Sequence, residues 1–142
     1  MRIEWTAVAA LVLAVGTAQA AELTLMWGDV VPATHPSVQM IGRVAEAVKA
    51  RTGGRVEIQA FPGGQLGGSR DMIEAVASGI QEMVIEAADN FGTWLPTISV
   101  VEASYIWRDA AHLQAAMKGP TGKDYEEQLR KARGMRILGT VY

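Results

Sequence analysis

Short strand-like stretches alternate with amphipathic helix-like stretches along most of the chain, and this alternation constrains the fold more than any other feature. The strand-like stretches are rich in apolar and β-branched residues and several are bounded by glycine. The helix-like stretches repeat apolar residues every three or four positions, as Val38, Ile41 and Val44 do. Strands and helices in alternation favour a parallel sheet with right-handed crossover helices. The sequence therefore predicts an α/β fold.

The expected elements can be placed by their end signals. Strands are predicted at residues 22–28, 55–61, 82–88 and 134–142, and an irregular crossover at 89–107. Two helices are expected to begin at the N-caps Ser37 and Ser69 and to end at Gly53–Gly54 and Gly79. Two further helices are predicted over Asp109–Met117, with Asp109 as its cap, and over Pro120–Ala132.

The first twenty residues have the pattern of a secretory signal peptide. Arg2 gives a positive start, Ala7–Val15 is apolar, and Ala18-Gln19-Ala20 offers the small residues that a signal peptidase needs. The apolar run is too short to span a bilayer, although a short N-terminal membrane anchor is the alternative. We therefore expect cleavage after Ala20 and export to the periplasm. Residues 21–142 would then form one domain.

Composition excludes several functions. The 13 basic and 15 acidic residues form no clustered basic face, so nucleic acid is not an expected partner. The absence of cysteine removes thiol catalysis and cysteine-ligated zinc. The two histidines, His35 and His112, have no second metal ligand within helical reach. No metal, cofactor or catalytic motif is recognisable, and we do not expect an enzyme.

The glycine-rich loop "FPGGQLGGSRDM" (residues 61–72) precedes a predicted helix and invites comparison with phosphate-binding loops. It lacks the Lys-Ser/Thr pair of a P-loop, because Gly68, Ser69 and Arg70 follow Gly67. It also lacks the glycine spacing of a dinucleotide-binding turn and follows the second strand, not the first. Glycines that supply positive φ in a tight turn are the favoured interpretation, with an anion at the helix N-terminus as the alternative.

Several segments together resemble a known family. They are the helix ending "RTGGRVEI", the run "FPGGQLGGSRDMIEAVASGIQEMVI", the segment "EASYIWRDAAHLQAAM" and the last stretch "GMRILGTVY". With the leader and the loop ending "HPS", they resemble the periplasmic solute-binding subunit of TRAP transporters (tripartite ATP-independent periplasmic; the DctP-like family). The resemblance covers essentially all of residues 21–142.

The resemblance implies a two-lobed α/β solute-binding fold, of which this chain is the N-terminal lobe, truncated at the crossover to the second lobe. Such a protein closes on a small organic acid and delivers it to the membrane permease subunits of the transporter, which an ion gradient drives. The arginine that grips the ligand carboxylate would lie in the second lobe, beyond this chain. The alternative is a fragment of a secreted α/β enzyme whose catalytic residues lie in a missing C-terminal part.

The resemblance also implies a ligand-binding side for the first lobe. It would be formed by Trp27 and Asp29 at the end of the first strand, by Ser69 and Arg70 at a helix start, and by Asp89 and Asn90 at the end of the third strand. Sialic-acid-binding members carry acidic and basic side chains at the positions of Ser69, Ala87 and Asn90. Their replacement here implies a smaller or more apolar acid.

Overall fold

The computed structural model describes residues 20–141, so the predicted signal peptide lies outside the described residues except for Ala20. Three parallel strands form the sheet in the order β2-β1-β3. They are β1 (Leu23–Gly28), β2 (Val56–Phe61) and β3 (Met83–Val84). Helix α1 (Pro36–Arg51) connects β1 to β2, and α2 (Ser69–Ser78) connects β2 to β3. The predicted α/β fold with a parallel sheet is confirmed.

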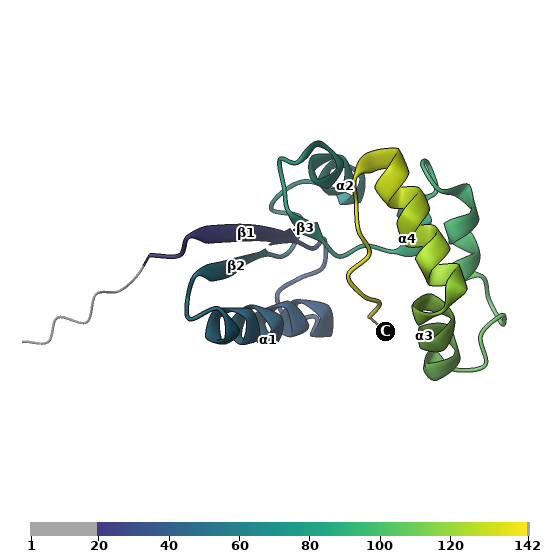
Figure 1. Ribbon diagram of the computed structural model, residues 1–142, viewed down its shortest axis with the longest axis horizontal. Helices are drawn as coiled ribbons and strands as arrows, with labels where there is room; N and C mark the ends of the chain where they lie inside the picture. The colour runs from purple at the N-terminus through teal and green to yellow at the C-terminus, as the bar shows by residue number, and fades with distance from the viewer. Residues whose placement is uncertain (1–19, 142) are drawn as a thin grey trace, which may run out of the picture.

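The two crossover helices lie on opposite sides of this sheet (Figure 1), with α1 below β2 and α2 above β3. The apolar stripe of α1 faces inward, because Val38 and Ile41 are buried. On α2 the buried residues are Met72 and Ile73. Each helix therefore covers one sheet face, and the carboxyl ends of the strands stay between them.

Both crossover helices begin at a different residue from the one predicted. The N-cap of α1 is His35, whose Nδ1 accepts a hydrogen bond from the Ser37 backbone N–H at 3.3 Å. Ser37 lies inside the helix because Pro36 already has the backbone geometry of a first turn. The N-cap of α2 is Gly68, and its N–H donates to the Asp71 carboxylate at 3.2 Å. Ser69 is thus the first helical residue, and its hydroxyl is not used as a cap.

The third strand is shorter than the predicted 82–88. Glu82 Oε2 accepts a hydrogen bond from the Met26 backbone N–H at 2.8 Å, and so takes a donor that a strand carbonyl would otherwise use. After Val84 a single further ladder bond, from Ile85 N–H to the Gly28 carbonyl at 3.2 Å, continues the pairing. The chain then forms two 3-10 helices, η1 (Ala88–Phe91) and η2 (Pro96–Glu102), in the predicted irregular crossover.

Two helices follow the crossover, α3 (Ala110–Lys118) with Asp109 as its cap, and α4 (Pro120–Arg133). Their apolar side chains join those of α2 and η2 in one cluster. The buried members of this cluster are Ile73, Leu95, Ile98, Tyr125, Leu129 and Met135. No helix among residues 20–141 is both long and apolar enough to cross a membrane.

The predicted last strand does not form, because residues 135–141 have no regular secondary structure. Met135 is buried in the cluster beside α4, and Arg136 pairs with Glu126 of α4 at 3.0 Å. These side-chain contacts place the start of the segment against α4 (Figure 1), and none of the three strands pairs with it. A strand pattern without a neighbouring strand edge remains an extended segment.

Candidate functional site

The candidate site lies where β1 and β3 end side by side. Gly28 and Val84 are register partners at the carboxyl ends of these strands. The order β2-β1-β3 means that the chain leaves β1 toward one side and returns on the other. In parallel α/β sheets, ligands bind in the crevice outside the strand ends at such a switch point. The predicted site residues lie at or after a strand end or begin α2.

Glu86, two residues after β3, lies at the centre of this region. The Asn90 amide donates a hydrogen bond to Glu86 Oε2 at 2.9 Å. The other oxygen, Oε1, is buried and has no hydrogen-bond partner within residues 20–141. Burial raises the pKa of the Glu86 carboxyl above its ordinary value, and the negative charge of Asp29 acts in the same direction. The Ser69 hydroxyl and the Asn90 amide oppose this increase.

Asp29 lies close by, but both oxygens of its carboxylate already accept hydrogen bonds from the chain. The side chain is almost fully buried, with 3% of the residue exposed. Its Oδ1 accepts from the Val31 backbone N–H at 3.1 Å, and its Oδ2 accepts from the Ser37 hydroxyl at 2.7 Å. Asp29 therefore fixes the loop after β1 to the first turn of α1.

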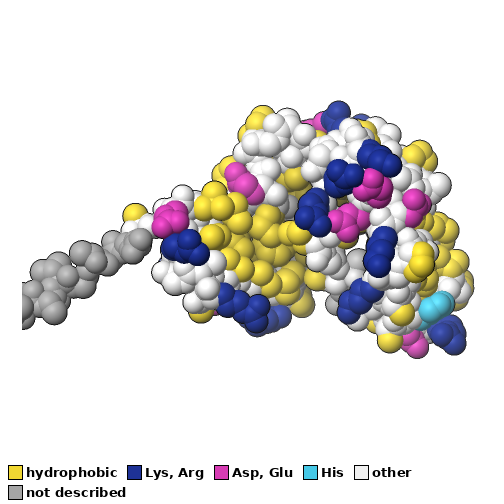
Figure 2. Space-filling model, viewed as in Figure 1, with side chains coloured by type: hydrophobic (Ala, Val, Ile, Leu, Met, Phe, Trp, Pro, Cys, Tyr) yellow, Lys and Arg dark blue, Asp and Glu magenta, His cyan; other side chains and the backbone are white. Residues whose placement is uncertain are grey.

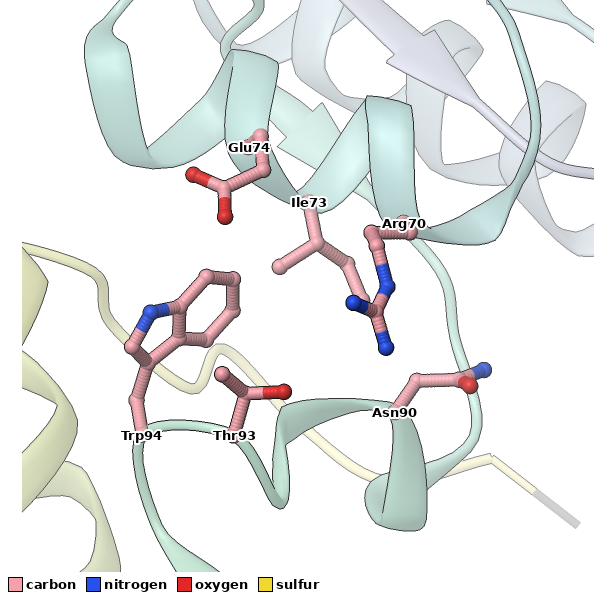
Figure 3. Close-up of a pocket in the computed structure, with 6 residues that line it drawn as sticks. All are labelled: Arg70, Ile73, Glu74, Asn90, Thr93 and Trp94. Atoms are coloured by element: carbon pink, nitrogen blue, oxygen red, sulfur yellow. The ribbon is translucent and has the colours of Figure 1, made fainter.

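Arg70 and Asn90 line a small pocket of about 20 Å³ between α2 and the η1 segment. The remaining lining residues are Ile73, Glu74, Thr93 and Trp94. In Figure 3 the Arg70 guanidinium extends from α2 into the space between Thr93 and Asn90, whereas the Asn90 amide is turned away from it. The amide is instead held by Glu86. Asn90 thus donates a hydrogen bond to the Glu86 carboxylate and also lines the small pocket.

The far wall of this pocket is fixed by α4. The Arg133 guanidinium lies 4.9 Å from the Trp94 ring centre, a cation–π contact, and bonds Glu74 at 2.6 Å. Trp94 and Glu74 are therefore both in contact with Arg133 of α4. Arg70 has no ion pair or hydrogen bond within the described part of the chain, and its guanidinium is exposed.

The structure brings together only some of the predicted site residues. Ser69 and Asn90 meet at Glu86, and Arg70 lies beside Asn90. Trp27 is half-buried near the end of β1, and its Nε1 is buried without a partner within residues 20–141. Asp89 is exposed in η1, outside the lining of the small pocket.

Glu86 is not among the site residues predicted from the sequence. The available signal was its position, a carboxylate two residues after the half-buried β3 and four residues before an asparagine. Among the described residues, no three side chains of the metal-ligating types gather around one point.

The glycine-rich loop has the structural role favoured above. Gly63, Gly64 and Gly67 have φ values of 67°, 70° and 116°, a region that favours glycine. The Gly63 N–H donates to the Val31 carbonyl at 2.7 Å, and the Gly64 N–H donates to the Asp29 carbonyl at 3.0 Å. The loop thereby closes on the segment after β1 and sets the start of α2 beside the strand ends.

Comparison with known proteins identifies the family. The family model described as bacterial extracellular solute-binding protein, family 7 (DctP), matches residues 27–142. The chain belongs to this family. A solute-binding protein of Verminephrobacter eiseniae is 32% identical over 84 residues, which cover 59% of this chain and 25% of that protein. The 2,3-diketo-L-gulonate-binding periplasmic protein YiaO of Escherichia coli is 27% identical over 93 residues, which cover 66% of this chain and 28% of that protein.

Solved TRAP periplasmic solute-binding proteins share the fold. The Sulfurospirillum deleyianum protein with bound succinate is 26% identical, with a TM-score of 0.71 over 78% of this chain and 36% of that chain. The Citrobacter koseri protein with bound D-glucuronate is 32% identical, with a TM-score of 0.66 over 75% of this chain and 35% of that chain. This DctP-family chain spans about a third of these solved proteins and has the fold of one of their lobes. The relatives are named for binding, so the alternative of a secreted enzyme has no support.

Proposed function

We propose that the chain forms the first lobe of a TRAP solute-binding protein that captures a small carboxylate and delivers it to the membrane permease subunits. One observation carries the proposal: polar side chains converge at the switch point of a lobe that is similar to lobes of carboxylate-binding proteins. The solved relatives with bound succinate, D-glucuronate and orotic acid are 26%, 32% and 31% identical. Export to the periplasm, with the signal peptide cleaved after Ala20, is part of the same proposal.

In this proposal the two lobes contribute different interactions. The first lobe offers neutral hydrogen-bonding groups at Ser69 and Asn90, the exposed guanidinium of Arg70, and Trp27 as an apolar wall. Each neutral hydrogen bond contributes about 1 kcal/mol, and a bidentate arginine–carboxylate pair contributes more. The principal carboxylate contact is therefore assigned to an arginine of the second lobe. Asp29 and Asp89 shape the charge around the ligand; Asp29 does so from its buried position.

A thermal-shift survey of the complete gene product tests this function. Carboxylates of two to ten carbons are compared with neutral sugars and with amines of matched size. We expect the melting temperature to rise with at least one carboxylate, because a ligand that binds only the folded state stabilises it. A protein that is stabilised only by neutral sugars or by amines would overturn the proposal.

A further inference from the structure

Glu86, at the candidate site, has one carboxylate oxygen without a hydrogen-bond partner within residues 20–141. Its Oε2 accepts from the Asn90 amide at 2.9 Å, while its Oε1 is buried and has no partner within residues 20–141. Buried polar atoms in native proteins almost always have a partner, and one without a partner needs an explanation. Glu86 Oε1 is an acceptor that still lacks a donor.

The groups around Glu86 leave its Oε1 without a hydrogen bond within residues 20–141. Asp29 is itself an acceptor, with both oxygens bonded to Val31 and Ser37. Arg70 forms no ion pair with Glu86 in the described part of the chain, although it lies on the adjoining turn of α2. The Ser69 hydroxyl and the Ala87 backbone N–H both act on the Glu86 carboxyl and lower its pKa, but Oε1 itself has no hydrogen-bond partner within residues 20–141.

The place of Glu86 makes a ligand the natural source of the donor. The residue follows β3 at the switch point, and its side chain as a whole is only half-buried. Rotation about the terminal bond of a glutamate is soft, so either oxygen can turn toward the exposed side of the residue. A carboxylate at this place repels the carboxylate of a bound acid, and a hydrogen-bond donor on that acid offsets part of the repulsion.

We propose that Glu86 is a specificity-determining residue that accepts a hydrogen bond from a ligand hydroxyl, so that the protein prefers hydroxylated acids to their deoxy counterparts. This inference rests on the proposed function and names its ligand class. A hydroxyl suits the site better than an ammonium group, because burial disfavours the charged form of Glu86 that an ammonium group requires. A hydroxyl can donate to the ionised carboxyl and accept from the protonated one.

The test uses pairs of acids that differ in hydroxyl groups: lactate and propionate, malate and succinate, gluconate and hexanoate. Calorimetry of the complete gene product measures the affinity ratio within each pair. We expect the hydroxylated acid of the pair that fits best to bind about ten- to a hundredfold more tightly, as for a hydrogen bond to a charged group. In Glu86→Gln the ratio falls to about threefold or less, and the deoxy acid binds more tightly than in the wild type. Glu46→Gln, which changes an exposed glutamate of α1, leaves the ratio unchanged.

A second variant guards against loss of folding. Glu86→Met has a similar length and no polar acceptor, and it should lose the preference in the same way. A wild-type protein that binds succinate as tightly as malate, and likewise in the other pairs, would overturn the inference and leave the proposed function intact. A preference for the hydroxylated acid that persists in both Glu86→Gln and Glu86→Met would also overturn the inference and leave the proposed function intact. If the wild type binds none of the six acids, nor any other carboxylate, the proposed function itself fails.

Discussion

At the scale of single residues, the carboxylates of Asp29 and Glu86 have opposite roles, although both lie near the strand ends. Asp29 has a donor for each oxygen and secures the chain between β1 and α1. Glu86 has a donor for one oxygen, and burial raises its pKa. A carboxylate with all its donors supplied stabilises the fold, whereas one with an unfilled acceptor is available to a ligand at some cost in stability.

The pH dependence of stability should reveal the cost at Glu86. Its pKa is raised in the folded state above the ordinary 4.5, so the folded protein binds more protons than the unfolded chain between those two values. Stability is therefore lost as pH rises through this interval. We expect Glu86→Gln to gain stability relative to the wild type as pH rises above 4.5, measured by urea unfolding between pH 4 and 8.

Glu127 contributes in the opposite direction and must be separated from Glu86. Hydrogen bonds from Arg130 and Lys131 lower the pKa of this exposed carboxyl to about 2. Its contribution is present above 4.5 and is lost as pH falls toward about 2. Both Glu86→Gln and the wild type contain Glu127, so the difference between their free energies of unfolding does not include its contribution. A difference that stays constant from pH 4 to 8 would contradict the role assigned to burial of Glu86.

The bond between Ser37 and Asp29 offers a second test at this scale. Ser37→Ala removes the hydroxyl that donates to Asp29 Oδ2 at 2.7 Å and leaves a buried carboxylate oxygen without a donor. We expect a loss of about 1–3 kcal/mol in the free energy of unfolding, measured by urea denaturation. Ser104→Ala, at an exposed serine, is the control. An equal effect in both variants would show that the Asp29 contact contributes nothing.

At the scale of elements, strong local signals predicted the structure well and tertiary contacts altered the ends. The helix ending at Gly79 was predictable because glycine adopts the left-handed conformation found there, with φ of 76°. Each crossover helix begins earlier than the sequence predicted, because Pro36 sets the start of α1 and the Gly68–Asp71 contact sets the start of α2. The last strand failed because strand formation depends on a partner edge, which residues 135–141 do not reveal by themselves.

Close packing of α2 on β1 can be tested at Gly28. A Cβ at this position would lie 2.5 Å from Met72 Sδ and 2.8 Å from Gln81 Nε2, and both residues are buried. Because the interior must shift to admit it, we expect Gly28→Ala to lower the free energy of unfolding by about 1–3 kcal/mol.

The matched control is Gly42→Ala on α1, where a Cβ would meet no atom within 4 Å. This change should stabilise the protein by up to about 1 kcal/mol, because alanine favours the helix over glycine. Thermal unfolding of both variants measures the contrast. If Gly28→Ala were as stable as Gly42→Ala, α2 would not pack against β1 as described.

At the scale of the whole molecule, the chain presents one lobe with apolar side chains on its surface. On the face in Figure 2, hydrophobic side chains gather over the part formed by β1, β2 and α1, and charged side chains lie mainly over α4. The α/β fold followed from the order of strands and helices, whereas the ligand-binding side came from the family resemblance alone. Neither source gave the contacts at this site, because the contact of Glu86 with Asn90 depends on a 3-10 turn that has no clear sequence signal.

Export is the first prediction for the whole molecule. Expression with the complete leader in a Gram-negative host should yield a periplasmic product that begins at Ala21, because small residues precede that position. N-terminal sequencing of the periplasmic fraction is the measurement. A product that retains Met1 in the membrane fraction would support the membrane anchor instead.

Calorimetry on two forms of the protein tests the central claim, that a carboxylate is held between unequal lobes. The complete gene product and residues 21–142 are each titrated with C4-dicarboxylates, 2-oxo acids, sugar acids and aromatic acids at millimolar concentration, after circular dichroism has shown that both are folded. We predict binding of at least one acid by the complete product and no measurable binding by residues 21–142, because the charged pair outweighs neutral hydrogen bonds of about 1 kcal/mol each. Tight binding by residues 21–142 alone would contradict this division between the lobes.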